Sequence, residues 1–483
     1  MASSSSCSSR SSLDASTDFQ YAEKHAFILT SESSCAQPSV PLRATVSGAF
    51  VNLLTSPTRL FTRCCIRFMH IISPSFLHRN HDTEQHGDLS PTAFLDGMRG
   101  LAAFVVFICH LTYGSFDLTY AYGAIPSISD SVSDRHDSFL RLPIVRLLYS
   151  GPPMVAIFFI VSGFALSYKP IRLMHSRQHE TFMMTMTSSM FRRGFRLFLP
   201  CFVSTFIVIC LAQLNLYSMT ETFSKQMRGV KEDHCYTQPN FWSQFTDYLQ
   251  QIHIFVNVFD WSLYSGSIEL DRHLWTIPAE YRCSMILFLT HIIVARMSIL
   301  LRLSTVIALT TWSISWDRWD MWPFWTGLAL AELDLLRSRS VTYGSSMPTF
   351  PIQDIELKKS EPGSTSSPSR SSRRLSETFY WAVFFVSLFL LSFPDAAGHA
   401  TPGYITLNKW IPASFSEKHR FWPTVGASLI VWSTCNLRFL RDRVFCWAPI
   451  QYLGRISFPL YVMHGPIIHT LGYMVSDLDT RPC

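Results

Sequence analysis

Nine apolar stretches, each close to the length of a membrane-crossing helix, set the main constraint on how this chain can fold. A helix needs about 20 apolar residues to cross the hydrocarbon core of a bilayer. The pattern therefore predicts an all-α polytopic membrane protein, a bundle of about nine to ten transmembrane helices with a disordered N-terminal tail. The predicted spans lie near residues 94–114, 147–168, 197–217, 273–294, 297–315, 319–336, 377–397, 421–437 and 450–475.

Composition supports a membrane protein, with the lipid bilayer as its first partner. Of the 483 residues, 48% are hydrophobic and only 15% are charged, whereas soluble domains have about 25% charged residues. The net charge of +6 does not indicate a nucleic-acid surface, so no nucleic-acid partner is expected. No histidine or cysteine cluster has the local spacing of a zinc site, and we expect no metal. An apolar setting predicts buried thiols at Cys109, Cys201, Cys210, Cys283 and Cys435.

The domain organisation follows from polarity along the chain. Residues 1–58 are Ser-rich and polar, which predicts a disordered cytosolic tail. Residues 59–93 are expected to form a basic amphipathic juxtamembrane segment. The membrane domain is expected over 94–475, with a cytosolic linker at 337–376 that is rich in Ser, Pro and charge. The stretch 241–259 is apolar but interrupted by polar residues, which favours a re-entrant or interfacial helix.

Loop charge predicts the orientation in the membrane. If the N-terminus is cytosolic, the loops on its side hold most of the loop arginines, and the opposite loops are acidic. This is the positive-inside bias of membrane proteins. We therefore predict a multi-pass integral membrane protein of the endoplasmic reticulum or plasma membrane, with a cytosolic N-terminus. The predicted cytosolic loops are 169–196, 295–296, 337–376 and 438–455.

Two polar residues share one face of the first predicted span. Arg99 and His110 are eleven residues apart, which places them within about 20° of each other around the helix and roughly 16 Å apart along it. A charge inside a membrane segment is costly and needs a partner or a function. Two alternatives stay open: Arg99 could reach lipid headgroups, and His110 could form a hydrogen bond between helices.

Later spans carry further polar residues at membrane depth. Glu280 lies about two turns into the fourth span and His464 about four turns into the ninth. The alternative to a functional role is a structural ion pair with an arginine for Glu280 and a purely structural role for His464. From the predicted orientation, we expect His110, Glu280 and His464 to meet in the outer half of the membrane. Arginines on the cytosolic side would suit an anionic, phosphate-bearing donor; they are Arg99, Arg192, Arg193, Arg196 and Arg455.

Six motifs occur in order along the predicted membrane domain. They are "FLDGMRGLAAFVVFICH", "AIFFIVSGFALS", "FRRGFRLFLP", "LWTIPAEY", "WPFWTGLALAE" and "YLGRISFPLYVMHGPI". The ordered set resembles the acyltransferase-3 family of integral membrane acyltransferases, especially its fungal branch, over about residues 92–475.

The resemblance implies transfer of an acyl group, commonly acetyl from acetyl-CoA, to a hydroxyl of a carbohydrate, glycolipid or secondary metabolite. Acyl-CoA is then the expected co-substrate and a hydroxylated acceptor the other partner, with no tightly bound cofactor. The family's paired Arg and His of the first helix fall on Arg99 and His110, and the carboxylate of its W-T-x-P-x-E segment falls on Glu280. These three are the expected catalytic residues.

The expected mechanism uses the arginines to hold the CoA phosphates while His110 takes the proton of the acceptor hydroxyl. Glu280 would orient His110 or the acceptor, and His464 would stabilise the oxyanion; direct transfer and an acyl-histidine intermediate both remain open. Ser162 lacks the G-x-S-x-G context of a nucleophile, and close helix packing is its alternative role. The expected substrate-binding residues are Arg192, Arg193, Arg196, His464 and Ser162.

Two other functions compete with this prediction. Intramembrane Arg, His and Glu could serve a proton-coupled solute transporter, although we find no inverted repeat and no matching pair of broken helices. Residues 476–483 are expected to be a short tail that replaces a final helix of the family, so the chain could also be an inactive, truncated relative.

Overall fold

A computed structural model describes residues 90–124, 137–218, 220, 234–261, 266–343 and 370–473. These residues all belong to one compact unit, Pro74–Cys483. The predictions for the tail 1–58, for most of the juxtamembrane segment 59–93, for the centre of the linker 337–376 and for the tail 476–483 lie outside the described residues.

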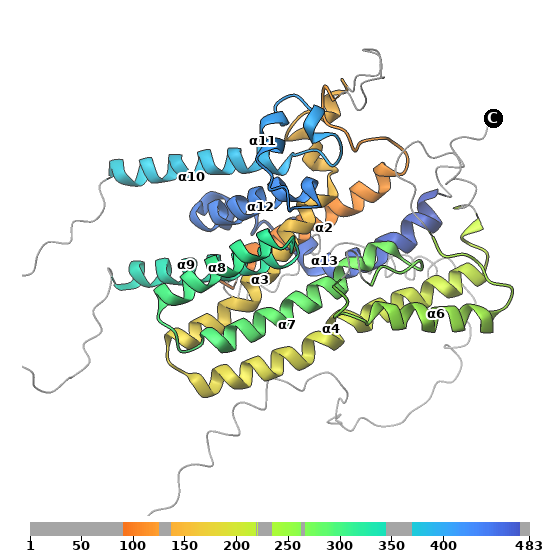
Figure 1. The fold of residues 1–483 in the computed structure, drawn as a ribbon, viewed down its shortest axis with the longest axis horizontal. Coiled ribbons are helices and arrows are strands. Elements are labelled where there is room, and N and C mark those ends of the chain that lie inside the picture. Colours follow the sequence, from red (N-terminus) through yellow and green to blue (C-terminus); the bar gives the residue numbers. More distant parts are fainter. Residues whose placement is uncertain are drawn as a thin grey trace, which may run out of the picture. The chain divides into compact units, whose positions relative to one another are not determined.

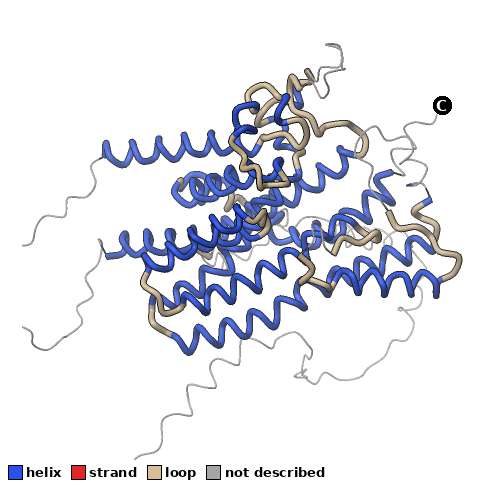
Figure 2. Tube along the Cα trace, in the orientation of Figure 1, coloured by secondary structure: helices blue, strands red, loops and turns tan. Residues whose placement is uncertain are grey.

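The described residues are helical throughout, apart from connecting loops and an isolated bridge between His234 and Asp271 (Figures 1 and 2). The longer helices are α2 (Ala93–Tyr113), α3 (Gly151–His175), α4 (His179–Gln213), α6 (Phe241–Phe255), α7 (Thr276–Val294), α8 (Ile299–Ser315), α9 (Met321–Tyr343), α10 (Arg370–Leu391), α12 (Lys418–Asn436) and α13 (Ala448–Ile467). The shorter ones are η2 (Phe139–Arg141), η3 (Val145–Leu148), η4 (Arg272–Trp275), η5 (Gly398–Ala400), α11 (Ile405–Lys409), η6 (Phe439–Val444) and η7 (Ile468–Gly472).

Each of the nine predicted spans coincides with a helix, so the all-helical prediction is confirmed for the described residues. Fewer of these helices meet the requirements for crossing a bilayer. In the described part of the chain, five are long and apolar enough, and α8 is apolar but shorter, so the count of nine to ten spans is not confirmed. The five are Ala93–Tyr113, Gly151–His175, His179–Gln213, Arg272–Val294 and Arg374–Leu391.

Two predicted loops are partly helical. The prediction of a loop over residues 169–196 is wrong, because α3 continues to His175 and α4 begins at His179. α4 therefore has 35 residues and is about 52 Å long, against roughly 30 Å of hydrocarbon. The linker expected at 337–376 is likewise shorter, since α9 ends at Tyr343 and α10 begins at Arg370. In both places the helices continue past the apolar stretch from which the span was counted, because polar residues can also form the backbone hydrogen bonds of an α-helix.

A helix also occupies the stretch that was expected to be re-entrant or interfacial. α6 begins at Phe241 because the side chain of Asn240 accepts a hydrogen bond from the Ser243 amide at 2.8 Å, the arrangement of an N-cap. Its buried face includes Tyr248 and Phe255. The hydroxyl of Tyr248 donates to the carbonyl of Phe202 at 3.1 Å, which ties α6 to α4.

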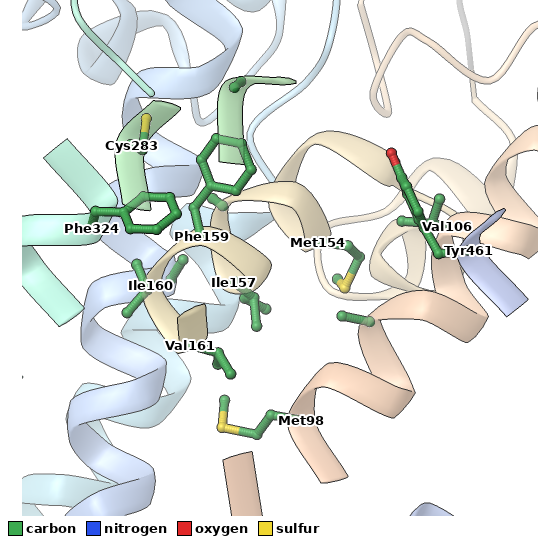
Figure 3. Close-up of a cluster of buried hydrophobic side chains, with 14 of the residues drawn as sticks. Met98, Val106, Met154, Ile157, Phe159, Ile160, Val161, Cys283, Phe324 and Tyr461 are labelled. Atoms are coloured by element: carbon green, nitrogen blue, oxygen red, sulfur yellow. The ribbon is translucent and has the colours of Figure 1, made fainter. Parts of the chain in front are cut away.

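Two helix pairs at the centre of the fold meet at glycines. α2 packs along α13, and a Cβ at Gly100 would lie 2.2 Å from the amide nitrogen of Gly454. α3 packs along α9, where a Cβ at Gly163 would lie 2.4 Å from the carbonyl oxygen of Phe324. Such small residues let helix backbones approach closely. The core next to the α3–α9 contact includes the rings of Phe159 and Phe324, whose centroids are 5.5 Å apart (Figure 3).

We expect Gly100→Ala to destabilise the protein by about 1–3 kcal/mol, because the new methyl group meets backbone atoms that no side-chain rotation can move. Thermal unfolding of the purified protein in detergent measures this. The control is Gly194→Ala in α4, where the nearest atom to the new Cβ would be a Tyr281 ring carbon at 3.6 Å. Equal stability of the two variants would contradict the close α2–α13 contact.

Candidate active site

A cavity of about 370 Å³, lined by both polar and apolar side chains, lies where α2, α3, α4, α7 and α13 meet. Four guanidinium groups line it: Arg99 from α2, Arg193 and Arg196 from α4, and Arg455 from α13. The structure thus brings together four of the five arginines that were expected on one side of the membrane. Arg192 is exposed and lies outside this lining; its Nε donates to the carbonyl of Ser188 on its own helix at 3.2 Å.

The carboxylate of Glu280 organises one wall of the cavity. Its Oε1 accepts hydrogen bonds from Nη2 of Arg193 at 2.7 Å and from the hydroxyl of Ser162 at 2.9 Å. Nε of Arg193 donates in turn to the hydroxyl of Ser284 at 2.7 Å. The arginine next to Glu280 in the sequence, Arg282, pairs with Asp320 instead, at 3.0 Å. Glu280 therefore holds Arg193 and Ser162 in place, and Ser162 is a polar member of the lining.

The cavity carries more positive than negative charge. Arg99 pairs with Asp96 at 2.9 Å, and its Nε donates to the hydroxyl of Ser457 at 3.0 Å. Within the described part of the chain, neither Arg196 nor Arg455 has an ion-pair partner, and both side chains are exposed. Guanidinium groups without carboxylates suit a phosphate-bearing ligand, because they form charge-assisted hydrogen bonds with its oxygens.

Three histidines from distant parts of the sequence form a cluster, which we call the histidine cluster: His110 of α2, His273 of η4 and His464 of α13. The ring centroids of His110 and His273 are 4.0 Å apart, those of His273 and His464 are 4.5 Å apart, and those of His110 and His464 are 5.1 Å apart. His273 and His464 are buried, with 6% and 1% of their surface exposed, whereas His110 is only partly buried. His110 is therefore the ring of the cluster with most access to a substrate.

Hydrogen bonds fix the orientation of the two buried rings. Nδ1 of His273 donates to Oδ1 of Asp271 at 2.8 Å, and Nδ1 of His464 donates to the carbonyl oxygen of Tyr461 at 2.6 Å. Both acceptors lack a proton to give, so Nδ1 carries the hydrogen in each ring. Gly465 makes room for this arrangement, since a Cβ there would lie 2.7 Å from Nδ1 of His273.

Tyr461 connects the cavity with the histidine cluster. Its side chain lines the cavity, its hydroxyl lies 2.5 Å from Oγ1 of Thr276, and the same hydroxyl donates to the carbonyl oxygen of His273 at 2.5 Å. The centroid of its ring is 5.6 Å from that of His464. The guanidinium groups of the cavity and the imidazoles of the cluster are thus linked through one buried tyrosine.

The structure corrects the expected meeting of His110, Glu280 and His464. His110 and His464 do come together, but Glu280 lies in the cavity, seven residues beyond His273. That separation is about 10 Å along a helix. His273 takes the expected place of Glu280, because η4 begins the α7 segment at the end that faces the cluster. The spacing of Asp271 and His273 directly before the "LWTIPAEY" motif was the one signal that could have indicated this pair.

A second cavity, of about 560 Å³, lies among α7, α8 and α9 and has almost entirely apolar walls. Its charged member, Arg318, already pairs with Asp320 at 2.6 Å. Apolar walls suit lipid chains but supply no acid or base. The candidate acid and base groups therefore lie in the first cavity and the histidine cluster.

The cysteines within the described residues show no sign of nucleophilic activation. Cys109, Cys201, Cys283 and Cys435 are buried, as the sequence predicted, and Cys210 is partly buried. In the loop before α6, burial raises the pKa of the Cys235 thiol to about 12. A thiol with that pKa stays protonated at neutral pH and is a poor nucleophile.

Comparison with known proteins identifies the class of protein to which this fold and site belong. The family model Acyl_transf_3, described as an acyltransferase domain, matches residues 92–482. The chain therefore belongs to this family of acyltransferases. Family membership and the apolar helices together indicate a membrane protein.

The relatives are fungal acyltransferases. O-acetyltransferase PaAT-1 of Phomopsis amygdali is 30% identical over 422 residues, covering 83% of this chain and 77% of the relative. Acyltransferase R4 of a Phoma species is 27% identical over 413 residues, covering 79% and 84%. Acyltransferase clz18 of Cochliobolus lunatus is 24% identical over 411 residues, covering 79% and 83%. No solved structure matches the chain significantly.

A double-mutant cycle tests the arrangement around Glu280. Glu280→Ala leaves the Arg193 guanidinium without its carboxylate, and Arg193→Ala leaves the carboxylate without its partner. We expect a coupling of about 0.5–3 kcal/mol in unfolding free energy between the two substitutions. The cycle of Glu280→Ala with Arg192→Ala is the control and should be additive. Additivity in the Arg193 cycle would contradict the ion pair.

Proposed function

We propose that this protein is a membrane-embedded O-acyltransferase that transfers an acyl group, such as acetyl, from acyl-CoA to a hydroxyl of a carbohydrate, glycolipid or secondary metabolite. The observation that carries the proposal is the cationic cavity that adjoins the histidine cluster at Tyr461. One part offers binding groups for phosphates, and the other offers imidazoles for proton transfer. The name of the relative PaAT-1 supports O-acetylation as the reaction.

The donor enters on the cationic side of the cavity. Arg196 and Arg455 bind the phosphates of acyl-CoA, while Arg99 and Arg193 line the path of the pantetheine arm towards the cluster. Glu280 positions Arg193 and Ser162 along this path. Arg192, on the exposed face of α4, contributes to the electrostatic attraction of the donor. In this proposal the N-terminus and the donor are cytosolic, in the endoplasmic reticulum or plasma membrane, which agrees with the arginine-rich loops.

His110 acts as the general base. Its imidazole takes the proton of the acceptor hydroxyl while the oxygen attacks the thioester carbonyl carbon; the new C–O bond forms, the C–S bond breaks, and the departing thiolate recovers the proton. Asp271 lies behind His273 and stabilises the positive charge that develops in the cluster. His464 cannot donate to an oxyanion while neutral, since its one N–H is already donated to Tyr461. His464 instead fixes the position of the other two rings.

We expect His110→Ala to lower kcat by about 10²–10⁴-fold, the usual contribution of a general base. The assay is transfer of labelled acetyl from acetyl-CoA to a mixed pool of hydroxylated acceptors by the purified full-length protein. His253→Ala is the control, because His253 is exposed on α6 and should not change kcat. Full activity of His110→Ala would end its proposed role. Solute flux without acyl transfer in the wild type would favour a transporter.

The donor site is tested by charge removal. We expect Arg196→Gln and Arg455→Gln each to raise KM for acetyl-CoA about tenfold, the effect of one charge-assisted hydrogen bond. Neither should alter KM for S-acetylpantetheine, a thioester donor without phosphates. Arg192→Gln, at an exposed position outside the cavity, should have the smaller effect. Equal changes with both donors would show that these arginines do not bind phosphate.

A further inference from the structure

We infer that His110, His273 and His464 form a binding site for a divalent transition-metal ion such as Zn²⁺. One ligand nitrogen from each ring lies within 4.8 Å of the other two. Nitrogen ligands in a tetrahedral zinc site are about 3.3 Å apart, given Zn–N bonds of about 2.0–2.1 Å. Ligation of one ion therefore requires the three nitrogens to approach one another by up to about 1.5 Å.

The orientation of the buried rings supports the site. Because Nδ1 of His273 and Nδ1 of His464 donate to Asp271 and to the Tyr461 carbonyl, the lone pair of each neutral ring is on Nε2. A zinc-binding histidine usually donates a hydrogen bond from its remote nitrogen to a carboxylate or carbonyl oxygen. The Asp271–His273 pair is buried, with 5% and 6% exposure, so the carboxylate is well placed to raise the basicity of the ring.

The donor set selects the kind of ion. Three imidazoles favour zinc and its neighbours in the transition series, whereas magnesium and calcium prefer oxygen ligands. Three protein ligands leave the fourth position of a tetrahedral ion open to water or a substrate oxygen. The partly buried position of His110 gives that fourth position access from outside the cluster.

Sequence spacing predicted no metal, whereas the tertiary structure brings three histidines together. Zinc motifs are recognised by ligands a few residues apart on one element. Here the ligands are separated by more than 150 residues each, on α2, η4 and α13. Only the packing of these elements brings the nitrogens together.

Under the proposed function, ion binding has a consequence for catalysis. A bound ion occupies the lone pair with which His110 would accept the proton of the acceptor hydroxyl. The ion-free protein is then the active form, and Zn²⁺ inhibits acyl transfer with the same concentration dependence as its binding.

The binding test uses full-length protein, purified in detergent and treated with a chelator, and titrates it with Zn²⁺ against a chromophoric competitor. We expect one high-affinity ion per chain. His273→Ala and His464→Ala should abolish this binding, and Asp271→Asn should weaken it about 10–100-fold. The matched control is His469→Ala: its ring centroid is 6.2 Å from that of His273, but it is outside the group of three and should leave binding intact.

A measurement on the wild type decides the matter even if these variants do not fold. X-ray absorption of the Zn²⁺-loaded protein should show nitrogen neighbours at about 2.0–2.1 Å with imidazole scattering from about three rings. Absence of high-affinity binding, or a site with sulfur or fewer imidazoles, would overturn the site while leaving the acyltransferase proposal to its own assay. Chelated protein that gains activity on addition of Zn²⁺ would overturn the inhibitory role.

Discussion

The backbone contact between α2 and α13 at Gly100 and Gly454 is the constraint on which the rest of the site depends. Because neither residue has a side chain, the two helices approach closely and their polar residues come into register. The same pair of helices places Arg99 beside Ser457 and His110 beside His464. A wider crossing would separate the imidazoles and remove one wall of the cavity.

The fold keeps two kinds of polar chemistry apart within an apolar core. Guanidinium groups and Glu280 line the cavity, imidazoles and Asp271 form the cluster, and Tyr461 stands between them. Separation matters because a guanidinium beside the imidazoles would disfavour the positive charge that a ring carries once it has accepted a proton. The arrangement suits a long donor molecule whose charged end and reactive end need different surroundings.

Some of the site could be predicted from the sequence, and some could not. Helical periodicity placed Arg99 and His110 on one face of their helix, and counting the depth of residues along each span brought His464 near His110. Both predictions were possible because the angle around a helix and the distance along it follow from the residue numbers within that helix. The same counting misplaced Glu280, because the η4 turn shifts the start of the α7 segment and presents His273 instead. Arg192 was grouped with its neighbours by charge alone, but the rotation of α4 turns it away from the cavity.

The sequence by itself determined the helical class, the approximate positions of nine of the longer helices and the family. Apolar length, period and ordered motifs are local properties, and each can be read from neighbouring residues. Only the tertiary structure decided that Asp271, His273 and Gly465 belong to the site and that three histidines share one centre. The reason is physical: these contacts join residues far apart in the chain, and they depend on helix crossings that no local pattern specifies.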